Sequence, residues 1–435
     1  MGKATILLVL GMSAIMSNML MTVNERQLPL VVEVSDHYEA IISRNIANSA
    51  ANIAVSKLYR NFSWKTGFDS TDLSGGDYKV ELRDVNFDTT FTVRRVKLMA
   101  ISNFAGRSDT VIVVMAQPPF SNYASFNSSW PTNLYYGTGD TLWGPVHTNQ
   151  KFGFAGYPVF YGKVTSVAPN YKTLGPTDPQ FLGGHQFGVD PIPLPDMSTG
   201  IGDLSSAAQN GGEVHNDNVW IKFKSNGTYQ YRYGGYPANE SNPNEWDGTS
   251  TLSDFNGTLM TNDGGGYDIH VKGVISGQLT ILSDRDIYIE DDIVYANDPR
   301  SDPASGDMLG LVAKNNVIVV DNLANQTDVE IHGAIVALNQ SFMVENYSAG
   351  GPRGTLTTFG SVVQDLAAPY GTGTMSGEVW VITNGYQEKS IYDGRFLNIG
   401  PPVFPIVQKV SLYSWQEDAG IEDYNHDILM PATTQ

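Results

Sequence analysis

The stretch ATILLVLGMSAIMSNMLMTV, residues 4–23, decides the fold of the first part of this chain. It contains no charged residue, and Asn24, Glu25 and Arg26 follow it at once. At about 1.5 Å per residue, a helix of this length spans a hydrocarbon core of about 30 Å. We therefore predict a helix whose apolar surface contacts lipid or other protein. The residues predicted to make these contacts are Ile6, Leu7, Leu8, Val9, Leu10, Ile15 and Leu20.

A second helical segment is predicted after Pro29. Its apolar residues recur at helical spacing, which is typical of an amphipathic helix; they are Tyr38, Ile42, Ile46, Ala50 and Ile53. Small residues crowd the same region and would let another helix approach closely; they are Ala47, Ser49, Ala50, Ala51 and Ala54. From this segment we predict Ile42, Ile46 and Ile53 as further contact residues.

An apolar first half, a proline near the join and an amphipathic second half resemble the N-terminal helix of type IV pilin-like subunits, in particular PilX-type minor pilins. The resemblance implies association with copies of this chain or with other pilin subunits, and residence in the inner membrane before assembly. Pilins carry a glutamate early in the apolar run, whereas residues 4–23 contain no acidic residue. A subunit without this carboxylate is expected to dock less specifically, which favours a minor or atypical role.

Two other interpretations of the N-terminus stay open. A cleaved secretory signal would have a basic start, a shorter apolar core and a small-x-small cleavage site. Lys3 fits such a signal, but the run is long and no A-x-A sequence follows it. A plain membrane anchor requires only the same apolar run.

The composition predicts a β-rich body and excludes several classes of partner. The chain has 435 residues with 44 Gly, 22 Pro and 22 Tyr, and only 16% of them are charged, which is typical of many short strands and turns. Its net charge of −19 repels nucleic-acid phosphates. The absence of cysteine excludes disulfides, thiol catalysis and cysteine-ligated zinc.

We predict an α+β to mainly β protein with five segments. They are an N-terminal membrane or filament helix (1–62), a small pilin-like β-sheet (63–117), a Pro- and Gly-rich region of loops and strands (118–215), a β-rich passenger (216–410) and a C-terminal tail (411–435). The small antiparallel sheet should contain strands near residues 78–82, 91–102 and 110–116 and should pack on the helix. In the second strand, Phe91, Val93, Arg95, Lys97 and Met99 should share one face, and Val96, Leu98 and Ala100 the other.

A hairpin is predicted around Asn226-Gly227, which joins two alternating runs. On its second arm Tyr229, Tyr231 and Tyr233 should share one face. This row could bind sugars or another subunit, or it could be cross-strand packing within the hairpin.

The passenger repeats a short motif of a glycine followed by apolar residues. The motif begins at Gly273, Gly310, Gly333 and Gly360, and a related earlier run begins at Gly144. Spacings of this kind favour a right-handed β-helix, or β-solenoid, with glycines at tight bends. A β-sandwich with long loops is the alternative. The phrases LWGPVHTN and YPVFYGKVTS, from Leu142 and Tyr157, resemble uncharacterised β-rich passenger domains found behind PilX-type helices, which implies a surface location and no known reaction.

No motif of a known enzyme class follows a suitable strand, so we predict no catalytic residues and no enzyme activity. One acidic stretch is a candidate Ca²⁺ site, because Ca²⁺ binds several oxygen ligands in flexible geometry. Its residues are Asp284, Asp286, Glu290, Asp291 and Asp292. The alternative is that they form the solvent face of a strand. No other cofactor is expected.

The sequence therefore predicts a structural subunit of a type IV pilus-like filament at the cell surface. It would assemble through its N-terminal helix and display a β-rich domain for adhesion or for contact with a glycan or another surface ligand. The alternatives are a membrane-anchored β-helix that acts on polysaccharide through the acidic stretch, and a glycan-binding protein held on a single anchor.

Overall fold

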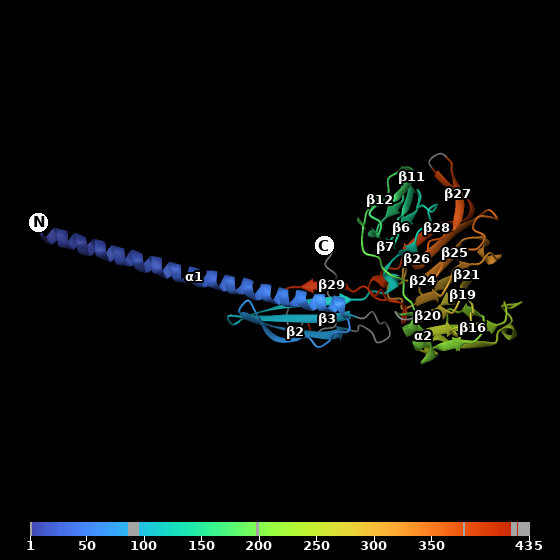
Figure 1. Ribbon diagram of the computed structural model, residues 1–435, viewed down its shortest axis with the longest axis horizontal. Helices are drawn as coiled ribbons and strands as arrows, with labels where there is room; N and C mark the ends of the chain where they lie inside the picture. The colour runs from blue at the N-terminus through green and yellow to red at the C-terminus, as the bar shows by residue number, and fades with distance from the viewer. Residues whose placement is uncertain (1, 86–94, 197–199, 377–378, 419–423, 425–435) are drawn as a thin grey trace. The chain divides into compact units, whose positions relative to one another are not determined.

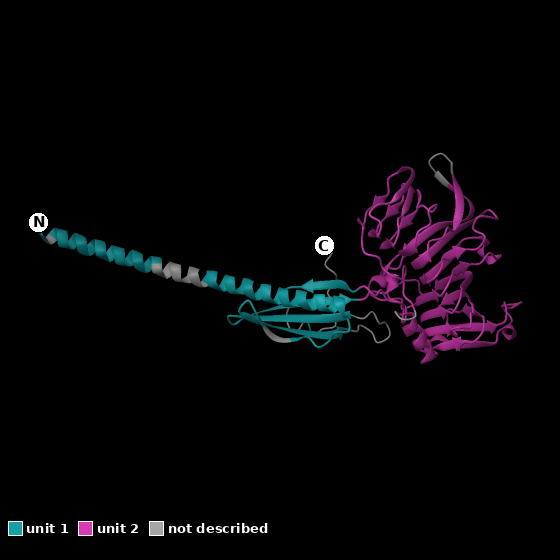
Figure 2. Cartoon of the chain, viewed as in Figure 1, with its two compact units in different colours: residues 1–85, 95–116, 410–435 teal, residues 86–94, 117–409 magenta. Residues whose placement is uncertain are grey.

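The chain folds into two compact units (Figures 1 and 2). The structure is a computed structural model that describes residues 2–85, 95–196, 200–376, 379–418 and 424. Unit 1 comprises residues 1–85, 95–116 and 410–435, and unit 2 comprises residues 86–94 and 117–409. The long central part of the sequence is therefore inserted into unit 1, which differs from the five consecutive segments that we predicted.

A single helix, α1 (Gly2–Arg60), forms where we predicted two helical segments. Lys57 and Arg60 lie in its last turn, where positive charge stabilises the carboxyl end of a helix. Its stretch Ala4–Val23 is long and apolar enough to cross a membrane, and none of it is buried inside the protein. The predicted apolar N-terminal helix is therefore present.

Unit 1 also contains a five-stranded antiparallel sheet. Its order is β1 (Phe68–Leu73), β2 (Gly76–Val85), β3 (Arg95–Phe104), β4 (Arg107–Ala116) and β29 (Ser411–Gln416). The three strands that we predicted correspond to β2, β3 and β4, while Phe91 and Val93 lie outside the described residues. The fifth strand comes from the segment that we predicted as a tail. Ser411 pairs with Ala116, so β29 lies directly beside β4.

Alanines on α1 let the sheet pack closely against the helix. Ala47, Ala50, Ala51 and Ala54 are fully buried together with Ile46 and Leu58. The sheet contributes alternate residues of β3 and β4 to this core, as their spacing predicted; they are Val96, Leu98, Ala100, Val111, Val113 and Met115. Within unit 1 the small residues therefore serve a helix–sheet contact, whereas we predicted a contact with another helix.

Polar contacts fix the same helix–sheet interface. The hydroxyls of Ser43 and Ser102 share a buried hydrogen bond of 2.9 Å. Arg107 on β4 forms ion pairs with Asp36 (3.0 Å) and Glu39 (3.5 Å) of α1. These contacts define the register of the helix on the sheet.

One predicted contact residue lies off this interface. Ile53 is 43% exposed, whereas its neighbour Ala54 is completely buried. The helical period of 3.6 residues carries the buried stripe through positions 47, 50, 51, 54 and 58 and turns position 53 toward solvent. Ile53 therefore lies on the exposed face of α1, and its contact with another subunit stays a prediction.

Replacing Ala50 by Leu should destabilise unit 1 by about 1–3 kcal/mol, because the added carbons have no space between helix and sheet. Thermal unfolding of the full chain in detergent, followed by calorimetry, measures the effect on the transition of unit 1. The matched variant Ser49→Leu changes the preceding residue, which is exposed, and should unfold like the wild type. Equal melting of both variants would contradict the close packing.

In its described residues, unit 2 consists mainly of strands with one α-helix, α2 (Ile201–Gln209). Its strands are β5 (Ser125–Ser129), β6 (Thr141–Leu142), β7 (Val146–Thr148), β8 (Gly153–Gly156), β9 (Val159–Phe160), β10 (Val164–Ser166), β11 (Lys172–Thr177), β12 (Gln180–Phe181), β13 (His185–Phe187), β14 (Glu213–His215), β15 (Val219–Phe223), β16 (Thr228–Tyr233), β17 (Gly248–Thr251), β18 (Thr258–Thr261), β19 (Ile269–Ile275), β20 (Gln278–Ser283), β21 (Ile287–Tyr295), β22 (Met308–Ala313), β23 (Val317–Val319), β24 (Val329–Ala337), β25 (Phe342–Val344), β26 (Pro352–Leu366), β27 (Gly371–Ser376) and β28 (Val379–Tyr392). Short 3-10 turns are η1 (Phe120–Asn122), η2 (Pro243–Glu245), η3 (Leu252–Asp254), η4 (Ala324–Gln326) and η5 (Gly394–Leu397). The protein is thus mostly β, as predicted.

Most strands of unit 2 pair in parallel, in long ladders (Figure 1). One ladder runs β14, β18, β20, β22, β24, β26, β5, β7, β10 and β13. A second runs β15, β19, β21, β23 and β25. Residues 125–187 precede β26 in sequence yet extend the first ladder beyond it. A part that we predicted as loops between short strands is therefore continuous with the passenger.

Stacked apolar residues fill the inside of the ladders. In the second ladder, residues that pair in register from strand to strand form one column, and all of them are fully buried. They are Val219, Ile269, Ile287, Val317 and Phe342. Such columns explain why the sequence of this region reads as repeated Val, Ile and Leu.

Two repeat glycines are required where β24 and β26 bend. Gly333 and Gly360 both have φ of +146° and pair with each other across the two strands. A Cβ atom on Gly360 would overlap the carbonyl oxygen of Gly333. These two glycines match the prediction of glycines at bends, whereas Gly310 is not among the residues with positive φ.

Candidate interaction surfaces

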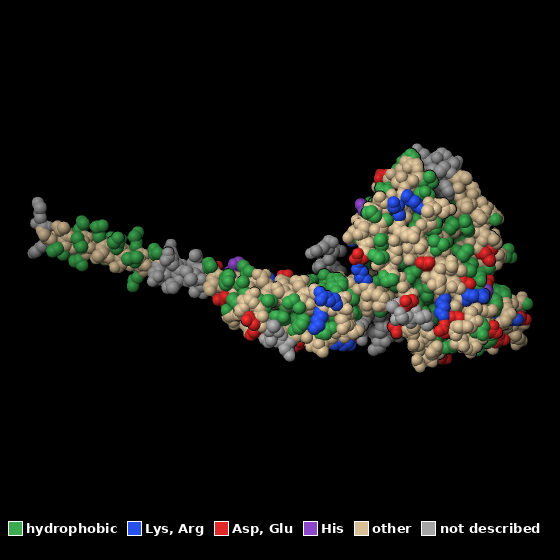
Figure 3. All heavy atoms as spheres, in the orientation of Figure 1, with side chains coloured by type: hydrophobic (Ala, Val, Ile, Leu, Met, Phe, Trp, Pro, Cys, Tyr) green, Lys and Arg blue, Asp and Glu red, His purple; other side chains and the backbone are tan. Residues whose placement is uncertain are grey.

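The exposed apolar half of α1 is the most extensive candidate surface of unit 1 (Figure 3). All seven residues that we predicted as contacts in residues 4–23 are more than half exposed. Ile15, for example, is 63% exposed. The further contact residues Ile42 and Ile46 instead belong to the core between helix and sheet. A continuous apolar surface of this kind requires lipid or protein to cover it.

The predicted row of tyrosines on β16 faces the core of unit 2 and not the solvent. Tyr229 is completely buried, and its hydroxyl donates a hydrogen bond to the carboxylate of Glu213. Tyr231 and Tyr233 are partly buried and pack against the same core, opposite Ile221 and Val219. The prediction that the three share a face is confirmed. Their prediction as contact residues is wrong for Tyr229, because this face of β16 packs on the core of unit 2.

The tyrosine row belongs to a buried polar group. Tyr233 and His215 share a hydrogen bond of 2.7 Å between the hydroxyl and Nδ1. Ser250 donates to Glu213 at 3.0 Å, beside the bond from Tyr229. Burial raises the pKa of Tyr233 above its ordinary value, and the nearby Tyr231 and Glu213 act in the same direction. The group therefore pairs the Tyr229 and Tyr233 hydroxyls, whereas Nε2 of His215 has no hydrogen bond and lies 3.5 Å from Oε1 of Glu213.

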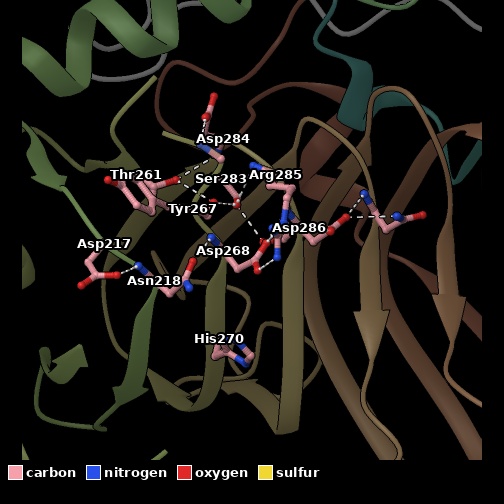
Figure 4. Close-up of polar contacts among 12 residues, drawn as sticks. Asp217, Asn218, Thr261, Tyr267, Asp268, His270, Ser283, Asp284, Arg285 and Asp286 are labelled. Atoms are coloured by element: carbon pink, nitrogen blue, oxygen red, sulfur yellow. Dashed lines mark hydrogen bonds and ion pairs between the residues drawn. The ribbon is translucent and has the colours of Figure 1, made fainter. Parts of the chain in front are cut away.

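The acidic stretch that we predicted as a calcium site is divided among separate contacts, and Figure 4 shows the region around Asp284 and Asp286. Asp284 accepts hydrogen bonds from the Lys314 ammonium and from the backbone N–H of Gly266. Burial alone would raise the pKa of Asp284, but these two donors hold it below its usual range. Asp286 accepts from the backbone and side chain of Asn316, at 2.8 and 3.0 Å.

The other acidic residues of the stretch lie on β21 and also have their own partners. Glu290 contacts Nδ1 of His270 at 2.6 Å and accepts from Asn322 at 3.0 Å. Asp291 accepts from the backbone of Asp292, and Asp292 accepts from the backbone of Glu330 at 2.8 Å. In the part of the chain that the structure describes, no three His, Cys, Asp or Glu side chains form a group that could hold a metal ion. The calcium hypothesis gains no geometric support.

A pair of half-buried acids in unit 2 was not predicted from the sequence. Ser390 of β28 pairs with Leu142 of β6, which brings Glu388 and Asp140, each two residues earlier, to matching positions. Burial, together with the charge of Asp140, raises the pKa of Glu388 to about 8. Burial also raises the pKa of Asp140 to about 6. The backbone N–H of Gly137, which donates to Asp140 at 2.7 Å, acts in the opposite direction and lowers this pKa. Among the described contacts, neither acid forms an ion pair. The two residues lie more than two hundred positions apart, so no local pattern could have indicated them.

The comparisons with known proteins give two findings. A family model described as "Domain of unknown function (DUF4900)" matches residues 88–168, which include β3 to β10 and so cross from unit 1 into unit 2. Among solved structures, the chain is similar to the competence-associated pilin ComZ from Thermus thermophilus, with 11% identity and a TM-score of 0.36. The match covers 87% of this chain and 97% of that chain. No curated protein matches. At this TM-score the likeness carries no argument, so the function below is argued from the residues.

Proposed function

We propose that this chain is a subunit of a type IV pilus-like extracellular filament, assembled through α1 and displaying unit 2 at the cell surface. The observation that carries the proposal is the division of α1 into two different surfaces. One face of its carboxyl half is buried against the sheet of unit 1, whereas residues 4–23 are apolar and none of this stretch is buried inside the protein.

One continuous helix suits this role. An anchor that only holds a protein at a membrane needs no rigid connection to the domain outside it. Here the same helix that can cross a bilayer is the element on which the sheet of unit 1 packs. Copies that associate through their exposed helix halves would bury this apolar surface after it leaves the lipid. Each sheet would then face outward.

We further propose that unit 2 is a right-handed parallel β-solenoid. Its parallel ladders, stacked apolar columns and stacked bend glycines support this fold. The right hand is expected from the strong preference of parallel crossovers for that hand. A repeated ladder also gives a large core to a protein without cysteine, which suits a location outside the cell.

Electron microscopy of material sheared from expressing cells tests the proposed function. We expect filaments that contain this chain, with mass spectrometry of their subunits showing a terminus at or near residues 1–3. Finding the protein only in detergent-extracted membranes, with Met1 intact, would leave a tethered surface protein and refute the filament.

A charge within the exposed apolar run should abolish assembly. Ile15→Asp places a carboxylate near the middle of residues 4–23, which costs about 2.5–3.5 kcal/mol in the apolar environment of a bilayer. We expect at least about a tenfold loss of the protein from the sheared fraction. The control Leu323→Asp alters a side chain of unit 2 that is 91% exposed and should assemble normally. Unit 1 should melt as in the wild type in both variants, and undiminished filaments of Ile15→Asp would exclude assembly through this surface.

A further inference from the structure

Two exposed aromatic residues of unit 2, Trp143 and Tyr161, lie on a different part of the ladder from the tyrosine row. Trp143 and Tyr161 are 49% and 42% exposed, and their rings stack with centroids 3.7 Å apart and planes 7° from parallel. Leu182, which is 63% exposed, directly follows β12, the strand that pairs with β9. We name Trp143, Tyr161 and Leu182 the apolar strip.

Strand register makes the strip a single column. Leu142 pairs with Phe160, and Phe160 pairs with Phe181, across β6, β9 and β12. The three paired residues pack into one aromatic core cluster beneath the surface. Each residue of the strip directly follows the last residue of its strand, and its exposed side chain shows that it points outward. The strip thus runs across the ends of three parallel strands, which are spaced at roughly 4.8 Å.

A glycine follows each residue of the strip. Cβ atoms on Gly162 and Gly183 would overlap the backbones of Gly144 and Gly162. The close stacking of the bends explains these glycines. It does not explain why the three large apolar side chains next to these glycines are exposed to solvent, since contact of apolar surface with water is unfavourable. A ligand that covers them would recover that free energy.

The strip itself carries no charge. Residues 141–144, 157–162 and 180–184 contain no Asp, Glu, Lys or Arg, and charged residues of both signs flank these ranges at Asp140, Lys163 and Asp178. Thr141 of β6 and Gln180 of β12 lie two residues before Trp143 and Leu182. The Thr141 hydroxyl donates to the Gly139 carbonyl at 3.4 Å and the Gln180 amide donates to Asp178 at 3.0 Å, which leaves the side-chain oxygens of both residues as acceptors for a ligand. Aromatic rings flanked by uncharged hydrogen-bonding groups suit a ligand that is itself uncharged, with both apolar C–H faces and hydroxyls.

We propose that the apolar strip is a binding surface for a neutral polysaccharide, an inference that rests on the display of unit 2 in the proposed function. A sugar ring offers C–H groups to the aromatic rings and hydroxyls to Thr141 and Gln180, and successive rings of one chain can follow the column. A second copy of this chain is a poorer occupant, because two subunits of charge −19 would meet at an interface with no opposite charges to pair.

Binding of the detergent-solubilised full chain to insoluble cellulose and chitin, and to an array of neutral and acidic glycans, tests the proposal. We expect binding to at least one neutral polysaccharide that persists at 1 M salt, because no charge pairing holds the ligand. The double variant Trp143→Ala/Tyr161→Ala should lose about tenfold or more in affinity, since stacked aromatic contacts contribute about 0.5–1.5 kcal/mol each beyond their buried area.

The conservative variant Trp143→Phe/Tyr161→Phe should restore part of the binding, and Leu323→Ser, which alters an exposed apolar residue outside the strip, should bind like the wild type. Calorimetry must show that the double variant retains the melting transition of unit 2. Absence of neutral binding, binding only to acidic glycans, equal binding by the double variant, or a change in self-association alone would each overturn the proposal. Filament assembly is scored separately, so loss of filaments with intact glycan binding would refute only the filament.

Discussion

Removing unit 2 and closing the gap with a tight turn should leave unit 1 folded. In this variant an Asn-Gly dipeptide replaces residues 118–409 and links Gln117 to Val410. We expect a single cooperative thermal transition and a circular dichroism spectrum with both helical and strand components. The reason is that β4 and β29 are antiparallel neighbours, with Ala116 paired to Ser411. Two-residue turns with Asn-Gly are the favoured link between such strands.

The shortened variant, which lacks residues 118–409, retains every described residue of the helix–sheet core. Val410 belongs to this core and is retained in the variant. The matched control ends the chain at Gln117 and therefore lacks Val410 and β29. Without β29, the apolar strand β4 becomes an exposed edge, which favours aggregation. We expect the control to aggregate or to melt well below the shortened variant. Equal behaviour of the two proteins would contradict the position of β29 in the sheet.

Unit 2 should lose stability as the pH rises from about 4.5 to 8. The native state keeps a proton on Glu388 up to a pKa of about 8, because burial and the nearby Asp140 disfavour its charge. In the unfolded chain the same carboxyl has a pKa near 4.5 and has already lost the proton in this range. The native state therefore binds more protons than the unfolded state, so the slope of stability against pH is negative. The penalty is absent below about pH 4.5 and complete above about pH 8.

Glu388→Gln should remove most of this slope. We expect the variant to melt close to the wild type at pH 4.5 and several degrees above it at pH 8, as measured by calorimetry of the full chain in detergent. Asp140→Asn should act in the same direction over a lower range, because the pKa of Asp140 is raised only to about 6. The control Asp190→Asn changes an acid whose side chain is 89% exposed and should leave the slope unchanged. Parallel curves for Glu388→Gln and the wild type would show that Glu388 is not buried as described.

Local sequence patterns predicted the elements of unit 1 but not the way the chain closes its sheet. The apolar run, the helical spacing and three strands are all properties of neighbouring residues. In contrast, β29 pairs with β4 across almost three hundred residues, and its sequence SLYSWQ has no distinctive pattern. The stacking of β5 beyond β26 was missed for the same reason. Pairings of this kind depend on the whole fold and leave no local periodicity.

The candidate residues show a second limit of sequence patterns. Alternation correctly placed Tyr229, Tyr231 and Tyr233 on one face, but it does not determine whether that face points to core or solvent. The acidic stretch was read as a cluster because its residues are close in sequence. In the fold, Asp284 and Glu290 contact different partners. The exposed Trp143 and Tyr161 come from separate strands and become neighbours only through the ladder.

The most direct test of the filament is disulfide cross-linking between copies of α1 within sheared, detergent-free material. The chain has no cysteine, so Leu10→Cys and Ile15→Cys each introduce a single reactive group on the exposed helix half. Ile46→Cys provides the matched control, because its side chain is buried against the sheet of the same subunit. We predict dimers from the first two variants and monomers from the third. Absence of the chain from the sheared fraction, or equal cross-linking at Ile46→Cys, would contradict assembly through the exposed half of α1.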